Sequence, residues 1–229
     1  MEKVTVLSLG GSIIVPKEID HPFLRRFTTA IRSYLEANKG RKVIIVTGGG
    51  ALARQYQGAY KDLCETPKVE LLDWLGIAAT HLNGTLLLSL LSDYCFDPLV
   101  RDPTAEIAFK GQVLVAAGWK PGFSTDTDAV ILAKRFGAKT IINLSNIAKV
   151  YTGDPKTDPS AQPLDSISWD DFRAMVGDEW IPGKNVPFDP VASRQAHQAG
   201  ISVVCGDGRN IENTLAILEG REYEGTLIS

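Results

Sequence analysis

The sequence has little cysteine and little histidine, with three residues of each among 229. Cys64, Cys95 and Cys205 are odd in number and far apart, which argues against a disulfide framework and against a thiolate zinc site. The histidines are equally scattered and form no H-x-x-x-H pair, so a metal bound by imidazoles is not expected. We therefore predict no metal site built by the protein alone, and any metal is expected to arrive with a ligand.

Long apolar runs and an excess of positive charge are also missing. Because no run reaches 18 apolar residues and the chain starts directly with a strand-like segment, neither a membrane span nor a signal peptide is predicted, and the cytoplasm is the expected compartment. The formal net charge of −3 offers no basic field for nucleic acid and favours a small anionic ligand held by local donors. With 44% apolar residues, the chain can fill one large α/β domain or two small lobes.

Glycine is concentrated where apolar runs stop. Residues 43–56 read VIIVTGGGALARQY, in which an apolar run ends at Gly48, Gly49 and Gly50 and resumes with helical spacing. This order predicts a strand, a turn of the size of a phosphate group, and a helix whose first N–H groups attract an anion. Arg54, early in that helix, carries a planar guanidinium suited to bidentate phosphate contact.

The same order opens the chain, where the run at 4–9 ends in Gly10, Gly11 and Ser12. Two such turns suggest two phosphoryl groups, whereas one alone is as readily explained by a helix packing on a sheet. Neither turn reads G-x-x-x-x-G-K-[ST], which excludes the P-loop NTPases, and neither reads G-x-G-x-x-G, so a dinucleotide fold has weak support.

Apolar periodicity predicts alternating strands and helices, and hence an α/β fold with a mostly parallel sheet between helices. Strands are expected at 4–9, from 43, near 94–100, and at 113–116, 140–144 and 201–205; helices are expected at 23–35, 73–91, 128–136 and 189–199. Residues 151–168 contain three X-Pro pairs and are predicted to be a loop of the kind that contributes ligand contacts.

Two further segments have the composition of binding loops. Residues 118–126 read GWKPGFSTD, and their last three residues are either a helix N-cap, worth about 1 kcal/mol, or part of an acceptor site in which Asp126 orients a cation. In residues 145–155, Tyr151 can stack on a base or ribose and Asp154 can accept from a sugar hydroxyl, unless the segment is only a turn. Asp73 is similarly either a ribose ligand or an exposed N-cap.

Five ordered motifs together resemble one known family. They are LGGS at 9–12, VTGGG at 46–50 followed by Ala53, Arg54 and Tyr56, D-x-x-G-x-x-x-T-x-x-N at 73–83, P-G-x-S-T-D at 121–126, and N-x-x-x-V-Y-x-x-D-P at 146–155. With matching gaps, they are similar to the amino acid kinase superfamily and most of all to its archaeal-type uridylate (UMP) kinases. The likeness covers residues 3–228.

This resemblance implies the amino acid kinase fold, a three-layer αβα sandwich in a single domain, 1–229. An N-terminal acceptor/phosphate lobe would span about 1–117 and a C-terminal ATP lobe about 118–229. The implied reaction transfers the γ-phosphoryl group of ATP to UMP, giving UDP for pyrimidine nucleotide biosynthesis, with Mg²⁺ arriving with ATP. A homo-oligomer, usually a hexamer, is implied, and neither nucleic acid nor membrane is expected as a partner.

The motif positions also imply roles for individual residues. The expected catalytic residues are Arg54 and Asp126. The expected ATP-binding residues are Gly11, Ser12, Gly50, Arg54, Ser145, Asn146, Tyr151 and Asp154. The expected UMP-binding residues are Gly48, Gly49, Asp73, Gly118, Trp119, Lys120, Pro121, Gly122, Phe123, Ser124 and Thr125.

The sequence departs from the family pattern at several positions. Ser8 stands where many members have lysine, His81 where arginine is frequent, Trp119 where a small polar residue is usual, and Ala148-Lys149 where Asp-Gly is usual. We expect Lys17, Lys120 or Lys149 to replace the missing lysine. Two alternatives stay open: a kinase of another small phosphate or carboxylate, and a non-catalytic nucleotide-binding or storage homologue.

Overall fold

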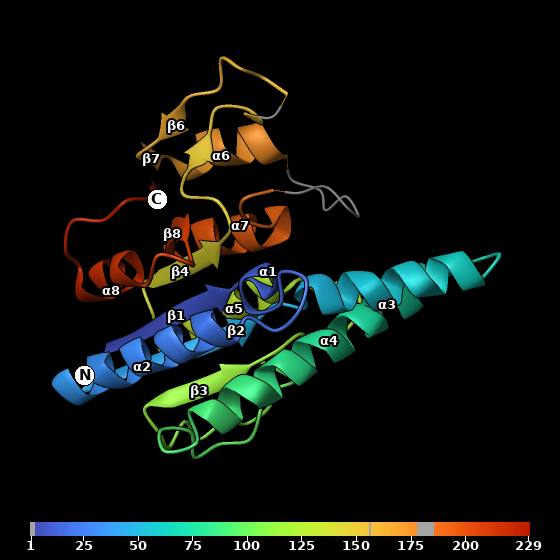
Figure 1. The fold of residues 1–229 in the computed structure, drawn as a ribbon. Coiled ribbons are helices and arrows are strands. Elements are labelled where there is room, and N and C mark those ends of the chain that lie inside the picture. The colour runs from blue at the N-terminus through green and yellow to red at the C-terminus, as the bar shows by residue number, and fades with distance from the viewer. Residues whose placement is uncertain (1–2, 156, 178–185) are drawn as a thin grey trace.

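The computed structural model describes residues 3–155, 157–177 and 186–229, and its centre is a seven-stranded sheet of order β3-β2-β1-β4-β8-β9-β7 (Figure 1). The strands are β1 (Lys3–Leu9), β2 (Arg41–Thr47), β3 (Val113–Ala116), β4 (Thr140–Ser145), β7 (Ser166–Ile167), β8 (Ser202–Asp207) and β9 (Thr226–Ile228). All neighbouring strands are parallel except β8 and β9. The prediction of a mostly parallel sheet is therefore confirmed.

Helices cover both faces of the sheet, which confirms the three-layer α/β sandwich. They are α1 (Gly11–Ile14), α2 (His21–Ala37), α3 (Gly50–Leu63), α4 (Val69–Leu90), α5 (Thr125–Phe136), α6 (Trp169–Val176), α7 (Pro190–Gln198) and α8 (Ile211–Glu219). Successive strand residues point to opposite faces. Accordingly, Val6 packs in the core shared with α5, α6 and α7, whereas Leu7 packs in the core shared with α2, α4 and α8. No helix in the described residues is long and apolar enough to cross a membrane.

Several predicted elements differ from the structure; helix α4, for example, begins four residues before the predicted residue 73. Residues 94–100 form no strand beyond one bridge between Val100 and Ala116, because proline at 98 interrupts the run. Residues 151–168 are less irregular than predicted, because β5 (Val150–Tyr151) pairs with β6 (Pro163–Leu164) in a separate two-stranded sheet. Helix α5 begins three residues earlier than predicted, since Ser124 caps it and its Oγ accepts from the N–H of Thr127 at 3.1 Å.

The order of the strands marks one point on the sheet edge. From β1 the chain adds β2 and β3 on one side and then returns to add β4 and β8 on the other. At such a switch point, the crevice outside the carboxyl ends of the strands is where open α/β sheets bind ligands. Here β1 and β4 end side by side, with Leu9 opposite Leu144 and the Gly10 N–H donating to the Leu144 carbonyl at 2.8 Å.

Candidate active site

The two glycine turns meet at this switch point, backbone against backbone. A Cβ atom on Gly11 would lie 2.1 Å from the nitrogen of Gly50 and 2.5 Å from the carbonyl carbon of Gly48. Gly50 has a φ of +65°, and a Cβ there would lie 2.2 Å from the Gly11 oxygen. Because any side chain at these positions would push the two turns apart, glycine is required for their contact.

Backbone donors are available at the same place. Helix α1 begins at Gly11 and helix α3 at Gly50. Among the described residues, no acceptor is recorded for the N–H groups of Gly11, Ser12 or Gly50. First-turn N–H groups carry partial positive charge, so the paired turns present two sets of donors to an anion.

Side chains from α4 and β2 hold the second turn in place. The Nδ2 group of Asn83 donates to the carbonyl oxygens of Gly48 at 2.8 Å and Gly49 at 3.2 Å. The Oγ1 group of Thr47 contacts the carbonyl oxygens of Thr80 at 3.1 Å and Ala116 at 3.2 Å. Asn83 was part of a predicted motif without an assigned role; its role here is to fix the turn.

Arg54 joins the two turns from the solvent side. It lies in the second turn of α3, is exposed, and donates from Nη1 to the Oγ of Ser12 at 3.1 Å. A guanidinium has five N–H donors, so this single bond leaves most of them for a bound anion.

A cavity of about 340 Å³ lies beside the turns, between α3, α4 and the 118–124 loop. Nine of the predicted site residues line it: Gly49, Gly50, Arg54, Asp73, Gly118, Gly122, Phe123, Ser124 and Thr125. The predicted residues Gly11, Ser12, Gly48, Trp119, Lys120 and Pro121 belong to the same turns and loop but do not line it. Three further lining residues, Ala53, Gly76 and Thr80, belong to the predicted motifs but had no assigned role. Sequence reasoning missed Gln57 and Ile77, which lie near motif residues on the two helices.

The 118–124 loop is held against α4 by three side chains. Asp73 accepts from the N–H of Gly122 at 3.0 Å, and the Oγ1 of Thr80 accepts from the N–H of Gly118 at 2.9 Å. The Nε2 of His81 lies 2.8 Å from the Gly118 oxygen, and since a carbonyl only accepts, Nε2 carries the hydrogen. Asp73 lies inside α4, so the alternative that it is an N-cap was wrong.

An aromatic and cationic stack forms the outer part of this loop. The rings of Trp119 and Phe123 are edge to face with centroids 4.7 Å apart, and the Nζ of Lys120 lies 3.8 Å above the first and 4.9 Å above the second. Such cation–π contacts contribute about 0.5–1 kcal/mol at exposed sites. Trp119 departs from the family pattern, and its ring holds the ammonium group of Lys120 against the same loop.

Two acidic residues at the start of α5 complete the site. Asp126 accepts from the Oγ of Ser8 at 3.0 Å and from the N–H of Asp189 at 3.2 Å; burial and then the charge of Asp189 raise the pKa of Asp126 to about 6. Asp128 is fully buried and accepts from the N–H of Trp119 at 3.2 Å. Burial raises the pKa of Asp128 to about 7, and the charges of Asp126 and Asp102 add to the effect.

These pKa values predict a pH-dependent stability. Between about pH 4 and 7 the folded chain keeps protons that the unfolded chain has released, so the free energy of unfolding falls as the pH rises. For Asp128, a pKa raised from 3.8 to about 7 corresponds to on the order of 4 kcal/mol. Thermal melts of wild type and Asp128→Asn at pH 5 to 8 test this. The thermal midpoint of the variant should rise relative to that of wild type as the pH rises, because the variant lacks the titrating carboxyl. A difference that stays constant with pH would contradict it.

The other four predicted ATP-binding residues follow the carboxyl end of β4 in the chain. Ser145 ends β4, its Oγ accepts from the N–H of Ile147 at 3.3 Å, and its carbonyl oxygen accepts from the N–H of Gly208 at 2.9 Å. Asn146 follows it and is exposed, Tyr151 is part of β5, and Asp154 lies beyond in the 152–162 connection. None of the four lines the 340 Å³ cavity.

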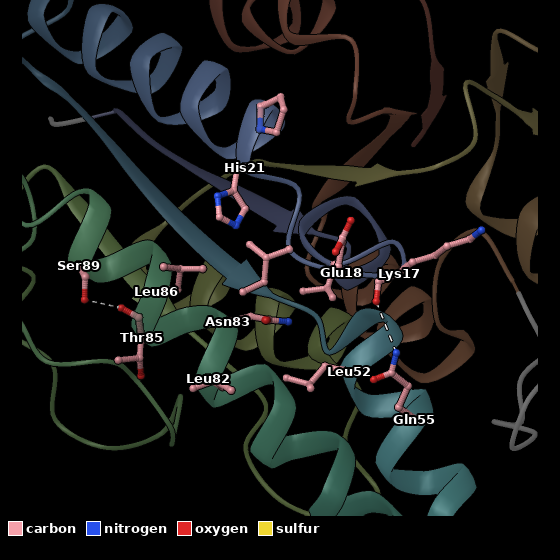
Figure 2. Close-up of a pocket in the computed structure, with 13 residues that line it drawn as sticks. Lys17, Glu18, His21, Leu52, Gln55, Leu82, Asn83, Thr85, Leu86 and Ser89 are labelled. Carbon is pink, nitrogen blue, oxygen red and sulfur yellow. Dashed lines mark hydrogen bonds between the residues drawn. The ribbon is translucent and has the colours of Figure 1, made fainter.

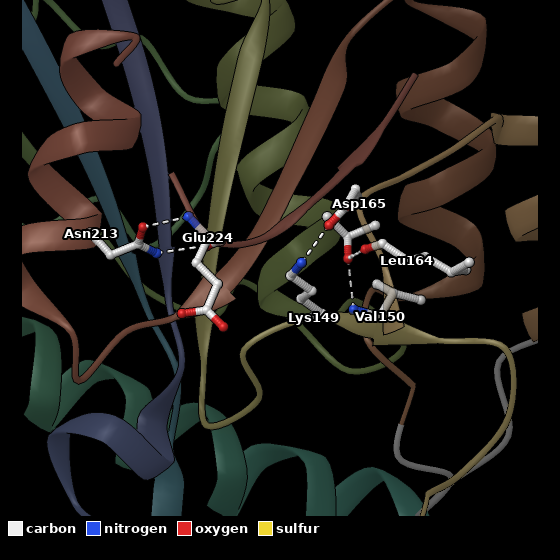
Figure 3. A network of polar contacts seen from close by, with 7 residues as sticks. Lys149, Val150, Leu164, Asp165, Asn213 and Glu224 are labelled. Atoms are coloured by element: carbon white, nitrogen blue, oxygen red, sulfur yellow. Dashed lines mark hydrogen bonds and ion pairs between the residues drawn. The ribbon is translucent and has the colours of Figure 1, made fainter. Parts of the chain in front are cut away.

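Lys149 has a structural contact that explains its departure from the family. Its Nζ forms an ion pair with Asp165 (Figure 3). Beside this pair, the N–H of Val150 donates to the Oγ1 of Thr226 at 2.8 Å, and the same hydroxyl donates to the carbonyl oxygen of Leu164. These contacts tie the β5–β6 sheet to β9. Lys149 is therefore occupied away from the glycine turns.

A larger cavity, of about 1000 Å³, lies on the opposite side of α3 and α4, against the start of α2 (Figure 2). Leu52, Leu82 and Leu86 contribute apolar surface, and Lys17 and Glu18 lie at its edge. None of the predicted site residues lines this cavity. Lys17, a second candidate to replace the missing lysine, faces this side of the molecule.

Comparison with known proteins identifies related chains. The model of the amino acid kinase family matches residues 3–207. The uridylate kinase of Methanospirillum hungatei is 33% identical over 227 residues, 98% of this chain and 94% of that protein, and that of Pyrobaculum neutrophilum is 36% identical over 225 residues, 98% of each. The crystal structure of uridylate kinase from Archaeoglobus fulgidus superposes with a TM-score of 0.83 at 33% identity, covering 98% of this chain and 99% of that one.

Proposed function

This chain belongs to the amino acid kinase family, and from that premise we propose that it is a uridylate kinase, an ATP-dependent phosphotransferase that converts UMP to UDP in pyrimidine nucleotide biosynthesis. The observation that carries the proposal is the 340 Å³ cavity, which the second glycine turn, Arg54, helix α4 and the 118–124 loop enclose, beside the contact between the two glycine turns. Uridylate kinase relatives match this chain over nearly its full length.

The geometry accounts for phosphoryl transfer without a general base, because the acceptor phosphate is already an anionic nucleophile. What the reaction needs is alignment and neutralisation of charge on the transferred group. The N–H groups at the starts of α1 and α3 and the Arg54 guanidinium supply fixed positive charge where the two turns touch. Three lysines were considered as substitutes for the lysine that many family members have in place of Ser8. Of these, we propose Lys120, because it lies on the 118–124 loop beside the cavity.

We propose that ATP is bound on the β4 side by Ser145, Asn146, Tyr151 and Asp154, with its phosphates at Gly11, Ser12, Gly50 and Arg54. UMP is bound on the α4 side, by the second glycine turn (Gly48 and Gly49), Asp73, and the loop from Gly118 to Thr125. This assignment divides the chain into an acceptor/phosphate lobe at about 1–117 and an ATP lobe at about 118–229. The loop that contacts UMP then extends from the second lobe toward the first.

The residues present fit a magnesium ion that arrives with ATP. Among the described residues no group of three metal-binding side chains occurs, and Mg²⁺ in kinases is held mainly by phosphates and one or two carboxylates. Asp126 is the carboxylate we propose for it, since each of its oxygens accepts only one recorded bond. When bound, the ion neutralises charge on the ATP phosphates.

Replacement of Asp73 by alanine is expected to raise the KM for UMP about five- to tenfold. The change removes the acceptor of the Gly122 N–H and a proposed ribose ligand, and loss of one exposed hydrogen bond costs about 0.5–1.5 kcal/mol. Steady-state kinetics with each substrate varied measure this, and the KM for ATP should change less than twofold. Glu70→Ala, on the exposed first turn of the same helix, is the matched control. Equal KM values for UMP in Asp73→Ala and wild type would contradict the assignment.

ADP release from Mg-ATP in the presence of UMP, CMP, dCMP, AMP, GMP or no acceptor tests the proposed function. Turnover with UMP well above the other acceptors is expected. Turnover with a different phosphate or a carboxylate would favour another kinase of the family, and ATP binding without ADP release would favour a non-catalytic homologue, the reading that Ser8 motivates.

We also propose that the protein forms a homo-oligomer, with the hexamer as the size that family resemblance suggests. Several large apolar side chains are exposed, with Leu63 87%, Phe96 65% and Leu82 62% accessible. Light scattering of the purified protein measures the oligomer directly, and a monomeric mass would contradict this part of the proposal.

A further inference from the structure

Gln57, on α3, is a polar residue of the 340 Å³ cavity outside the predicted motifs. It follows Arg54 by three residues, so the two side chains share one face of the helix, and both line the cavity. On the facing helix α4, Asp73 and Gly76 have the same spacing and line the same cavity. Gln57 therefore lies about one helical turn further than Arg54 from the second glycine turn.

Two contacts fix the side-chain amide of Gln57 against α4. Its Nε2 donates to the carbonyl oxygen of Leu72 at 2.9 Å, and since a carbonyl only accepts, the nitrogen and not the oxygen faces that atom. A Cβ atom on Gly76 would lie 2.9 Å from the same nitrogen, so the lack of a side chain at Gly76 leaves room for the amide. Because Leu72 and Gly76 flank Asp73 on α4, the amide lies beside the turn that carries Asp73.

Gln57 and Asp73 each have one oxygen left for a ligand. The Oε1 of Gln57 accepts no hydrogen bond from any described residue, and within the same residues Asp73 accepts only through Oδ2, from the N–H of Gly122. Both side chains are half-buried and line the cavity. Amide and carboxylate oxygens are acceptors, so a ligand that satisfies both must present two donors close together.

We propose that Gln57 determines specificity for ribonucleotides: its Oε1 accepts from one of the two ribose hydroxyls of the acceptor nucleotide, and Asp73 accepts from the other. Vicinal hydroxyls are two adjacent donors, and a deoxyribonucleotide lacks one of them. The order along α3 fits a nucleotide, since Arg54 meets the phosphate and Gln57 meets the next group, the sugar. The inference rests on the proposed function, because it concerns the same cavity, and it adds a residue and the sugar that the cavity selects.

The bond between Gln57 and Leu72 also suits a residue that only packs α3 on α4. Such a role predicts an equal effect on every acceptor, because the contact between the helices does not depend on the sugar. A contact with a hydroxyl predicts an effect that disappears when that hydroxyl is absent. The sugar of the acceptor therefore separates the two roles.

The test compares kcat/KM for UMP, 2′-deoxy-UMP and 3′-deoxy-UMP in wild type and Gln57→Leu, with saturating Mg-ATP. Leucine is similar in size to glutamine, forms helices equally well and has no polar side-chain atom. We expect the variant to lose about three- to tenfold toward UMP, the effect of one hydrogen bond at a half-exposed site, and less than about twofold toward the deoxynucleotide without the contacted hydroxyl.

Gln55→Leu is the matched control, because it makes the same change on the same helix. Gln55 faces the larger cavity on the other side of α3, where its Nε2 donates to the carbonyl oxygen of Lys17 at 3.4 Å (Figure 2). Its preference for UMP over the two deoxynucleotides should equal that of wild type. A loss in Gln57→Leu that is equal for UMP and both deoxynucleotides, or no loss toward any of them, would overturn the proposal.

Calorimetric titration of the same three nucleotides without ATP keeps this proposal apart from the proposed function. We expect wild type to bind UMP more tightly than one deoxynucleotide, and Gln57→Leu to bind these two with similar affinity. That result in a protein that transfers no phosphoryl group to UMP would contradict only the proposed function. Equal affinities of wild type for UMP and both deoxynucleotides would overturn the proposal about Gln57 even if UMP is phosphorylated, and absence of UMP binding would overturn both.

Discussion

Replacement of Gly11 by alanine is expected to reduce turnover at least a hundredfold. The new methyl group would lie 2.1 Å from the Gly50 nitrogen and 2.5 Å from two further backbone atoms, the Gly48 carbonyl carbon and the Gly49 nitrogen. Backbone cannot move aside as a flexible side chain can, so the two glycine turns must separate. A displacement of about 1 Å in groups that align a reaction costs on the order of a hundredfold in rate, and both sets of phosphate donors move here.

Gly58→Ala is the control for this substitution, because a Cβ there meets no atom within 4 Å and the residue is inside helix α3. It should leave kcat unchanged and stabilise the helix by about 0.5–1 kcal/mol. Both variants are compared with wild type in kcat and in thermal midpoint. If Gly11→Ala turned over at the rate of Gly58→Ala, the contact between the turns would have no part in catalysis.

Arg54→Ala is expected to lower kcat/KM about a hundred- to a thousandfold. Loss of one preorganised donor to a developing charge typically costs ~2.7–4 kcal/mol in the transition state, and Arg54 joins both phosphate turns through its bond to Ser12. The side chain is exposed, so its removal should leave the thermal midpoint nearly unchanged.

Arg54→Lys separates charge from geometry, since lysine keeps the positive charge and loses the planar fork. We expect this variant to fall between wild type and Arg54→Ala when kcat/KM is measured with UMP and Mg-ATP. Wild-type turnover and nucleotide affinity in Arg54→Ala would remove Arg54 from the phosphate site.

The glycine turns could be predicted from the sequence because their signal is local. An apolar run, three glycines and a helical pattern within residues 43–56 determine a strand, a turn and a helix without reference to distant residues. The same holds for the Ser124 cap, whose partner Thr127 is three residues away. The mostly parallel sheet could be predicted because several such strand–helix units follow one another in the sequence, and strands linked by helices run parallel.

The contacts that hold the 118–124 loop could not be predicted in this way, because their partners are far apart in sequence. Asp73 bonds Gly122 across 49 positions, and Thr80 bonds Gly118 across 38. Asp128 lay within a predicted helix and had no pattern that would distinguish a buried carboxylate from a solvated one. Lys149 was expected near phosphates from its charge, whereas its partner Asp165 comes from a segment predicted to be a loop.

The most direct test of the account follows the phosphoryl group itself. Purified protein is incubated with UMP, Mg²⁺ and ATP labelled in its γ-phosphoryl group, and the products are separated by chromatography. The account predicts that the label moves into UDP in proportion to the ADP formed, and that Arg54→Ala slows this transfer. The central claim is that the protein binds the ATP phosphates at the paired glycine turns and transfers the γ-phosphoryl group to a nucleotide in the adjoining cavity. Label released as inorganic phosphate, or retained in ATP while UMP stays unchanged, would contradict that claim.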